Sequence, residues 1–285
     1  MNSVALALVL GAAFFHATWN LLAKRVSGGA PFVWLTDIVG VLFYAPLAIP
    51  FIIVSLSDFT LIAVVMIVGT AVLHLAYFVQ LQRSYKVGDL SLIYPLARGT
   101  GPAIAALVAV FFFGERPTPI ALVGILLVIV GIFILTGGLR LLRGFDNPLA
   151  IAYGLLTGVF IASYTLWDKR AVSFFLISPL IYYYTSIVLR VLLLAPYALT
   201  RRKELVDIWR AHHRETIGTG ILSPLSYFMI LTALVFTPVS YVAPAREVSV
   251  LIGTFMGSRF LAEGNARQRL LAAAVILLGV IALAV

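Results

Sequence analysis

Long apolar stretches follow one another through almost the whole chain, and they limit the fold more than any single motif. Of the 285 residues, 62% are hydrophobic and 11% are charged, whereas soluble domains carry about 25% charged residues. A helix that crosses a bilayer needs about 20 apolar residues. Ten such stretches cover residues 3–23, 31–55, 59–82, 90–113, 118–137, 148–167, 177–199, 216–236, 239–261 and 267–285. The remaining residues make short connections, so the sequence predicts a membrane protein without a soluble domain.

Helices are the expected form of these stretches, because an open sheet would leave unpaired backbone groups in lipid. A β-barrel would need segments of about ten residues with alternating hydrophobicity, and the chain has none. The first stretch lacks the charged start and the small-residue cleavage motif of a signal peptide, so we expect it to be retained as a span. The predicted fold class is an all-α membrane protein with ten transmembrane helices.

Basic residues in the connections predict the orientation. Fourteen follow the odd-numbered stretches, and three, Arg116, Lys169 and Arg170, follow the even-numbered ones. The fourteen are Lys24, Arg25, Arg83, Lys86, Arg140, Arg143, Arg201, Arg202, Lys203, Arg210, Arg214, Arg259, Arg267 and Arg269. Because cytoplasmic loops carry the excess of Lys and Arg, both termini are predicted to face outward. We expect the block Arg201–Arg214 to be a cytoplasmic loop near anionic lipid.

The chain also looks duplicated. Ala97-Arg98 is followed 17 residues later by Glu115, and Ala245-Arg246 is followed 17 residues later by Glu263. The domains are predicted to be two five-helix repeats, at residues 1–140 and 148–285. Because five is odd, the second repeat must be inserted upside down, which is a recurring plan in secondary transporters. Gly124, Gly131 and Gly279 are expected to let helices pack closely.

Three stretches resemble the EamA family of the drug/metabolite transporter superfamily: HATWNLLAK (16–24), GDLSLIYPLARGTGP (88–102) and FFFGERPT (111–118). The resemblance implies a ten-helix metabolite carrier of the type that exports amino acids, including aromatic ones. Other relatives move drugs or sugars. Relatives are commonly drawn with both termini in the cytoplasm, whereas the count of basic residues in the connections predicts that both termini of this chain face outward. Small four-helix multidrug relatives carry an acid in their first span, whereas His16 is the only ionisable group in that span here.

Away from the ends of the predicted spans, five strongly charged residues lie inside them: Asp37, Arg98, Arg190, Arg246 and Glu247. An arginine facing lipid at mid-bilayer costs about 2.5–3.5 kcal/mol, so these side chains should face water, one another or a substrate. Asp37, Arg190 and Glu247 are predicted to form charge pairs. Three arginines against two acids leave one positive charge, which favours a substrate carboxylate. The alternative is that all the arginines are structural, paired with the acids or with backbone carbonyls.

Aromatic and polar residues recur on the same helix faces and are candidates for lining a substrate cavity. The predicted substrate-binding residues are His16, Trp19, Asn20, His74, Tyr77, Phe78, Tyr94, Arg98, Tyr164, Trp167, Ser223, Tyr227 and Arg246. The alternative is that they form interfacial belts and hydrogen bonds between helices. A histidine is also a candidate carrier for a coupling proton. Glu115 and Glu263 are expected to cap loops or to pair with Arg116 and Arg267.

The sequence therefore favours a secondary transporter of amino acids or similar small amphipathic metabolites, acting by alternating access around a central cavity and exporting its substrate. The alternatives are a multidrug or quaternary ammonium exporter and a sugar or sugar-phosphate exchanger. An enzyme is not expected, because the chain has no cysteine, P-loop, GxSxG or HExxH motif. The predicted partners are a small-molecule substrate and the lipid bilayer, with no cofactor, no metal, no nucleic acid and no implied oligomer. The expected location is a bacterial inner membrane.

Overall fold

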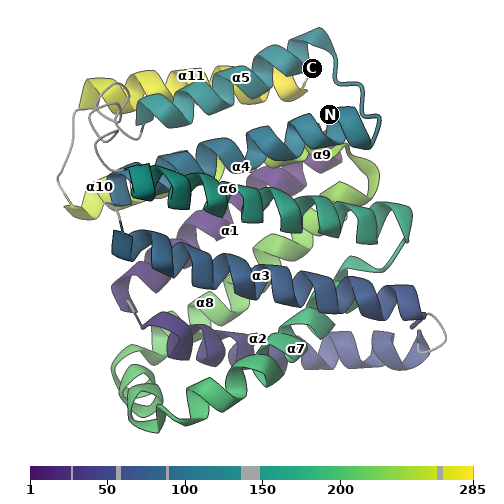
Figure 1. Ribbon diagram of the computed structural model, residues 1–285, viewed down its shortest axis with the longest axis vertical. Helices are drawn as coiled ribbons and strands as arrows, with labels where there is room; N and C mark the ends of the chain where they lie inside the picture. Colours follow the sequence, from purple (N-terminus) through teal and green to yellow (C-terminus); the bar gives the residue numbers. More distant parts are fainter. Residues whose placement is uncertain (27, 56–58, 88–89, 136–147, 262–265, 285) are drawn as a thin grey trace.

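The computed structural model describes residues 1–26, 28–55, 59–87, 90–135, 148–261 and 266–284, and these segments are helical apart from short connections (Figure 1). The helices are α1 (Ser3–Val26), α2 (Gly29–Val54), α3 (Leu61–Val87), α4 (Leu90–Phe112), α5 (Pro119–Leu135), α6 (Pro148–Lys169), α7 (Pro179–Leu199), α8 (Arg202–Phe236), α9 (Val239–Ala245), α10 (Val248–Leu261) and α11 (Ala266–Ala284). A π-helical turn, η3 (Arg170–Phe174), extends α6. Apart from this extension of α6 and two other places, the bounds lie within five residues of the predicted ones.

The first exception is the start of α8. This helix begins at Arg202 rather than at residue 216, so the prediction that Arg201–Arg214 is a loop is wrong for all but its first residue. The segment is helical because Leu205 is buried and Ile208 packs close to Gly28. At His212 the backbone leaves helical geometry (φ −137°, ψ 31°), and the helix kinks there.

The second exception is the predicted span 239–261, which is broken into α9 and α10. The amide of Arg246 still bonds to the carbonyl of Val242 over 3.0 Å, but the amide of Glu247 bonds to Pro244, three residues back. Pro244 itself has no amide hydrogen to donate. The break therefore falls at the two charged residues of this span.

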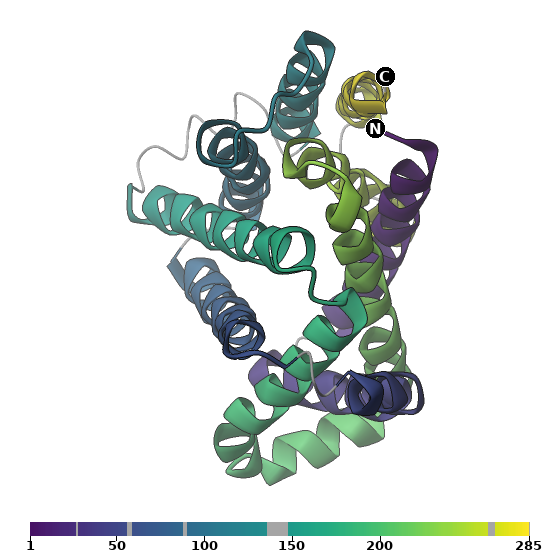
Figure 2. The same cartoon turned by 90° about the vertical axis from the view of Figure 1, so that its right-hand side faces the viewer.

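The helices form two groups that meet along the long axis of the molecule. In Figure 2, α3, α4 and α6 lie on one side and α1, α8, α9 and α10 on the other. The pairs α2–α7 and α5–α11 close the two ends (Figure 1). The N and C marks lie together at one side, where the amino group of Met1 donates to the carbonyls of Leu283 and Ala284 over 3.4 and 3.2 Å.

Large apolar side chains lie exposed on the outside of nearly every helix; Val54 and Phe112, for example, are 84% and 79% exposed. In water, apolar patches of this extent would drive aggregation, whereas in a bilayer they match the solvent. By length and composition, six of the described helices can cross a membrane: α1, α2, α3, α6 with η3, α7 and α8. Shorter apolar segments are Leu96–Phe112, Pro119–Ile134 and Leu271–Ala284.

Glycines allow the close contact between α5 and α11, as predicted. A Cβ added at Gly124 would lie 2.8 Å from the carbonyl oxygen of Gly279, and one added at Gly131 would lie 3.0 Å from the amide nitrogen of Ile276. Because backbone atoms cannot rotate away, a larger residue would force the two helices apart. The expected packing role of Gly124, Gly131 and Gly279 is confirmed.

Candidate functional site

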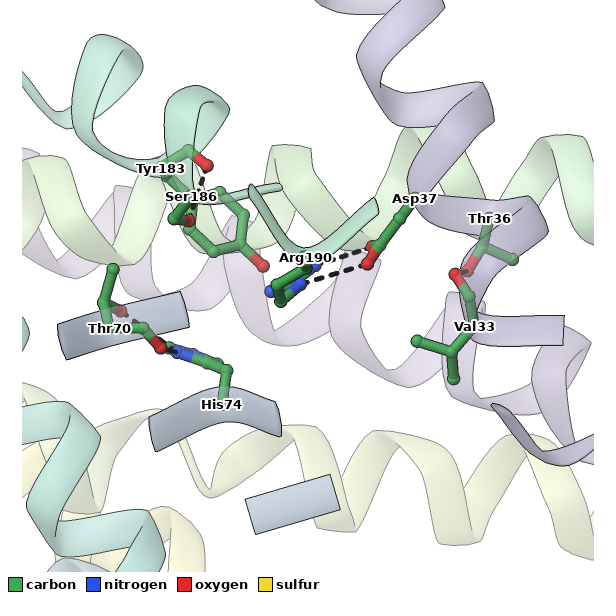
Figure 3. A network of polar contacts seen from close by, with 8 residues as sticks. All are labelled: Val33, Thr36, Asp37, Thr70, His74, Tyr183, Ser186 and Arg190. Atoms are coloured by element: carbon green, nitrogen blue, oxygen red, sulfur yellow. Dashed lines mark hydrogen bonds and ion pairs between the residues drawn. The ribbon is translucent and has the colours of Figure 1, made fainter. Parts of the chain in front are cut away.

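An ion pair joins α2 to α7 inside the molecule. Arg190 donates from Nε and Nη2 to the two carboxylate oxygens of Asp37, over 3.0 and 2.6 Å (Figure 3). Such two-point pairs are the strongest arrangement between a guanidinium and a carboxylate. The guanidinium of Arg190 also lies 5.6 Å from the ring centre of Tyr183. The structure thus joins two residues that the sequence predicted to form charge pairs.

A second charged group sits at the break between α9 and α10. Nη2 of Arg98, on α4, lies 2.9 Å from Oε2 of Glu247 and 3.3 Å from the hydroxyl of Ser249. Nε of Arg246 lies 3.9 Å from Oε1 of the same Glu247. All three charged side chains are buried, and Glu247 is fully so. The broken helix thus brings Arg246 and Glu247 to the arginine of the helix opposite.

Five rings form an aromatic cluster between these two charged groups: His74 and Tyr77 on α3, Tyr164 on α6, Tyr183 on α7 and Tyr227 on α8. Ring centres are 4.4 Å apart for His74–Tyr164, 5.5 Å for Tyr77–Tyr164, 5.3 Å for His74–Tyr227 and 4.6 Å for Tyr183–Tyr227. The aromatic cluster therefore contains residues from helices of both the first and the second part of the chain.

Hydrogen bonds fix the edges of the aromatic cluster. Nδ1 of His74 lies 2.9 Å from the carbonyl oxygen and 3.1 Å from the hydroxyl of Thr70, one turn back on α3 (Figure 3). Nη2 of Arg246 donates to the hydroxyl of Tyr164 over 3.4 Å. One guanidinium thus lies at the Tyr164 edge, and that of Arg190 lies at the Tyr183 edge.

Asp168 belongs to this site, although it is not among the residues predicted from the sequence. It is fully buried near the end of α6, and its carboxylate accepts hydrogen bonds from the hydroxyls of Tyr182, over 2.6 Å, and of Tyr227. With Asp168, the described part of the chain holds three buried acids beside Arg98, Arg190 and Arg246. The net charge of the site therefore depends on whether Asp168 is ionised, and the surplus of one positive charge stays a prediction. The helical spacing of four residues from Tyr164, which puts both on one face, could have revealed Asp168.

The remaining predicted residues lie around this site in different settings. The rings of His16 and Trp19 are 4.9 Å apart on α1, and the exposed Asn20 donates its side-chain amide to the carbonyl of His16 over 2.8 Å. Trp167 donates to the carbonyl of Met66 over 2.9 Å, and its ring packs against Gly69 on α3. This contact gives Trp167 a packing role between α6 and α3.

Three further predicted residues are less informative. Phe78 and Ser223 are partly buried on α3 and α8, and the side chain of Tyr94 lies outside the described part of the chain.

Glu115 was expected to cap a loop or to pair with Arg116. Its carboxylate accepts the amides of Val239 and Ser240 over 2.8 and 2.9 Å, and so it caps the start of α9. Glu263 and Arg267 lie outside the described side chains.

A family model for EamA-like transporters matches residues 3–137 and again residues 148–285, which together make up nearly the whole chain. The chain belongs to the EamA-like transporter family. This membership, together with the apolar helices, makes the protein an integral, multi-pass membrane protein of the drug/metabolite transporter superfamily. Such a protein has a small-molecule substrate and the membrane lipid as partners.

Two individual proteins add to this finding. A multidrug transporter of Pseudomonas aeruginosa is 36% identical over 70 residues, which are 25% of this chain and 61% of that protein. One solved crystal structure superposes with a TM-score of 0.72 at 15% identity and covers 99% of this chain and 96% of the other. At that identity the likeness concerns the fold alone.

Proposed function

We propose that this protein is a secondary transporter that exports amino acids or similar small amphipathic metabolites by alternating access around a central cavity. The substrate site would be the aromatic cluster together with Arg246. Aromatic rings offer an apolar surface to the substrate side chain, and a guanidinium offers donors to its carboxylate. The predicted lining residues His16, Trp19, Asn20, Phe78, Tyr94, Arg98, Trp167 and Ser223 remain candidates around this centre.

The helix contacts support an inverted repeat of residues 1–140 and 148–285 as part of this proposal. If α1 to α5 correspond to α6, α7, α8, α9 with α10, and α11, the contacts occur in matching pairs. The contact of α1 with α8 corresponds to that of α6 with α3, and α4 with α6 corresponds to α10 with α1. The pairs α2–α7 and α5–α11 each correspond to themselves. Two such halves can exchange conformations and open one site to either side in turn.

The position of Arg246 is the observation that carries the proposed substrate class. Arg190 has its carboxylate partner at 2.6 Å and Arg98 at 2.9 Å, whereas among the described residues no carboxylate lies closer to Arg246 than 3.9 Å. Arg246 is nevertheless buried, and it faces Tyr164. A substrate carboxylate would supply the close acidic partner that the guanidinium of Arg246 lacks among the described residues.

Counterflow of labelled amino acids in proteoliposomes tests the proposal. Arg246→Gln should lower uptake of carboxylate substrates by about 10- to 100-fold, because a hydrogen bond to a charged group contributes about 1.5–3 kcal/mol. The matched control is Arg201→Gln, which changes an exposed arginine paired with Glu204 at 2.9 Å and should leave uptake unchanged. Failure of the wild type to move amino acids or other small metabolites would refute the transport proposal, and normal uptake by Arg246→Gln would remove Arg246 from the site.

Export of multidrug or quaternary ammonium compounds is the second candidate. The match to a multidrug transporter supports it, as do the five clustered rings, which attract cations, and the third buried acid, Asp168. Competition of amino-acid uptake by a panel of quaternary ammonium ions, sugars and sugar phosphates separates this candidate from the first. Inhibition by the cations alone would favour it, whereas inhibition by the sugar compounds would favour the exchanger alternative.

The proposed location is the inner membrane of a bacterium, which the Pseudomonas relative supports. The proposed orientation has both termini outside, because the connections at the opposite side carry most of the basic residues.

A further inference from the structure

Asp168 differs from the other buried acids that the structure describes. Glu247 and Asp37 each have a guanidinium nitrogen within 3 Å. Among the described residues, by contrast, no lysine or arginine forms an ion pair with Asp168. Its neighbour Lys169 is directed elsewhere, because its ammonium donates to the carbonyls of Leu234 and Thr237 over 2.8 and 3.0 Å. The partners of Asp168 are hydroxyl groups.

A carboxylate that is removed from water without a counter-charge is destabilised, and binding a proton removes that cost. Hydroxyl partners suit both protonation states, because a hydroxyl both donates and accepts a hydrogen bond. An arginine can only donate, so it stabilises the ionised acid alone. The choice of partners at Asp168 therefore permits a proton to bind and leave, whereas Asp37 and Glu247 each face a guanidinium that can only donate hydrogen bonds.

The hydroxyl of Tyr182 has two acceptors within reach. It lies 2.6 Å from Oδ1 of Asp168 and 3.4 Å from the carbonyl oxygen of Met66 on α3. With the acid ionised, the hydroxyl donates to Asp168. With the acid protonated, the new O–H of Asp168 donates to the oxygen of Tyr182, and the hydroxyl of Tyr182 turns to Met66. One proton is gained, and every hydrogen of this group keeps an acceptor, because the Met66 carbonyl, which already accepts the indole N–H of Trp167 over 2.9 Å, is then shared by two side-chain donors.

We propose that Asp168 is a proton-binding site of this transporter and that the Tyr182 hydroxyl changes its acceptor from Asp168 to Met66 when the proton binds. The proton would couple to transport because the other partner, Tyr227, packs against Tyr183 and His74 in the aromatic cluster. This coupling rests on the proposed function, whereas the binding of the proton does not.

The surroundings of Asp168 define what else bears on its charge. The groups that face it from the neighbouring helices are Thr70 on α3, Tyr182 and Tyr183 on α7, Tyr227 on α8 and Arg246 at the end of α9. Arg246 is the one cation of this set and favours release of the proton. His74, bonded to Thr70, is a second titratable group nearby, so the test must report on a carboxyl group and not on the cluster as a whole.

The end of α6 opens to the outside one residue along the chain from Asp168. An open pocket of about 380 Å³ is lined by Lys169 and Arg170, together with residues from the α4–α5 and α8–α9 connections. These connections lie on the same side of the molecule as the two termini (Figure 1). The structure therefore points to this side as the one from which the proton arrives.

Infrared difference spectra between acidic and alkaline pH test proton binding without any substrate. The spectrum of the purified wild type should contain a C=O stretching band of a protonated carboxyl group that is missing from the spectrum of Asp168→Asn, in addition to the bands of exposed acids such as Glu204 and Asp207 that both proteins share. Tyr182→Phe should shift the band, because the acid loses one hydrogen-bond partner. Tyr184→Phe is the matched control, since it removes the hydroxyl that donates to the carbonyl of Val41 over 3.3 Å on the same helix, and it should leave the band in place. Identical carboxyl bands in the wild type and Asp168→Asn would overturn the proposal.

Transport with and without a pH gradient tests the coupling. In proteoliposomes, the ratio of uptake with the gradient to uptake without it should exceed one for wild type and Tyr184→Phe, and it should fall to about one for Asp168→Asn. Tyr182→Phe should keep a ratio above one but change its pH dependence. A wild-type ratio of one would overturn the coupling. If the wild type moved no substrate at all, the proposed function would fail, while the infrared band would still decide whether Asp168 binds a proton.

Discussion

Single residues hold the two ends of the site through ion pairs between helices that are distant in the chain. The pair of Asp37 and Arg190 joins residues 153 positions apart, and both side chains are largely buried. Burying such a pair gains little over an apolar pair, but removing one partner leaves an uncompensated charge and costs about 3–5 kcal/mol. The stability of the protein should therefore fall when either member of the pair is replaced.

We expect Asp37→Asn to lower the free energy of unfolding by about 3–5 kcal/mol, measured by denaturant unfolding in detergent. Asp207→Asn is the matched control, because it makes the same change at an exposed position of α8 and should have little effect. Replacing both partners, as in Asp37→Asn with Arg190→Gln, should recover part of the loss. Equal stability of Asp37→Asn and Asp207→Asn would mean that the pair contributes nothing.

The sequence was informative about which residues are buried charges, and less so about their partners. Charged residues in the middle of apolar stretches, such as Arg98 and Asp37, stand out. Asp168 did not, because it lies beside Lys169 and Arg170, where the charge pattern is typical of the end of a span. The structure shows α6 continuing through η3 to Phe174, so Asp168 lies inside the span. Which acid meets which arginine depends on how the helices pack, and no local pattern records that.

At a few glycines, the backbones of two neighbouring helices approach each other closely, and these positions determine how the helices pack. A Cβ added at Gly279 would lie 2.9 Å from the carbonyl oxygen of Gly124 and 2.9 Å from the amide nitrogen of Val128. One added at Gly253 on α10 would meet only the Cβ of Ala17, at 3.9 Å among the described atoms. The two glycines thus differ in packing, although both lie within apolar helices.

Gly279→Ala should destabilise the protein by about 1–3 kcal/mol through overpacking, even though alanine is the better helix former. Gly253→Ala should be neutral or stabilising. Thermal unfolding of the two variants in the same detergent provides the measurement. A melting temperature for Gly279→Ala at or above that of Gly253→Ala would show that α5 and α11 can move apart without cost.

Glu115→Ala should weaken the start of α9, because two amides of that helix lose their acceptor. The expected loss is about 1–2 kcal/mol for a capping interaction, with faster hydrogen exchange at residues 239–245. Arg116→Ala, at the exposed neighbour, is the control and should exchange like the wild type. Unchanged exchange in Glu115→Ala would show that solvent or other groups satisfy these amides equally well.

Hydrophobicity alone was enough to predict nearly every helix, because lipid requires a long apolar stretch for each crossing. It failed at the start of α8, because a helix segment that is not apolar gives no such signal. That segment is rich in charge and looks like a loop, but Leu205 and Ile208, three residues apart, give it one buried edge. The break between α9 and α10 was equally hidden, because an apolar stretch with one proline is also compatible with a kinked but continuous helix.

For the molecule as a whole, labelling of single cysteines tests the orientation. The chain has no native cysteine, so each variant carries one thiol. If both termini are outside, Arg116→Cys, in the α4–α5 connection on their side, should react with a membrane-impermeant maleimide in intact cells. Arg201→Cys, between α7 and α8 on the opposite side (Figure 1), should react only after the membrane is opened. The reverse pattern would put both termini in the cytoplasm.

Among the described residues, the two closest buried ion pairs both connect the first part of the chain to the second: Asp37 to Arg190, and Arg98 to Glu247. During synthesis, Asp37 and Arg98 enter the bilayer long before the ribosome has made their partners. Until then each is an uncompensated charge in a medium that penalises it. The nascent first part must therefore stay with the insertion machinery or a chaperone until the second part arrives. A product truncated before Arg190 would leave both charges without these partners.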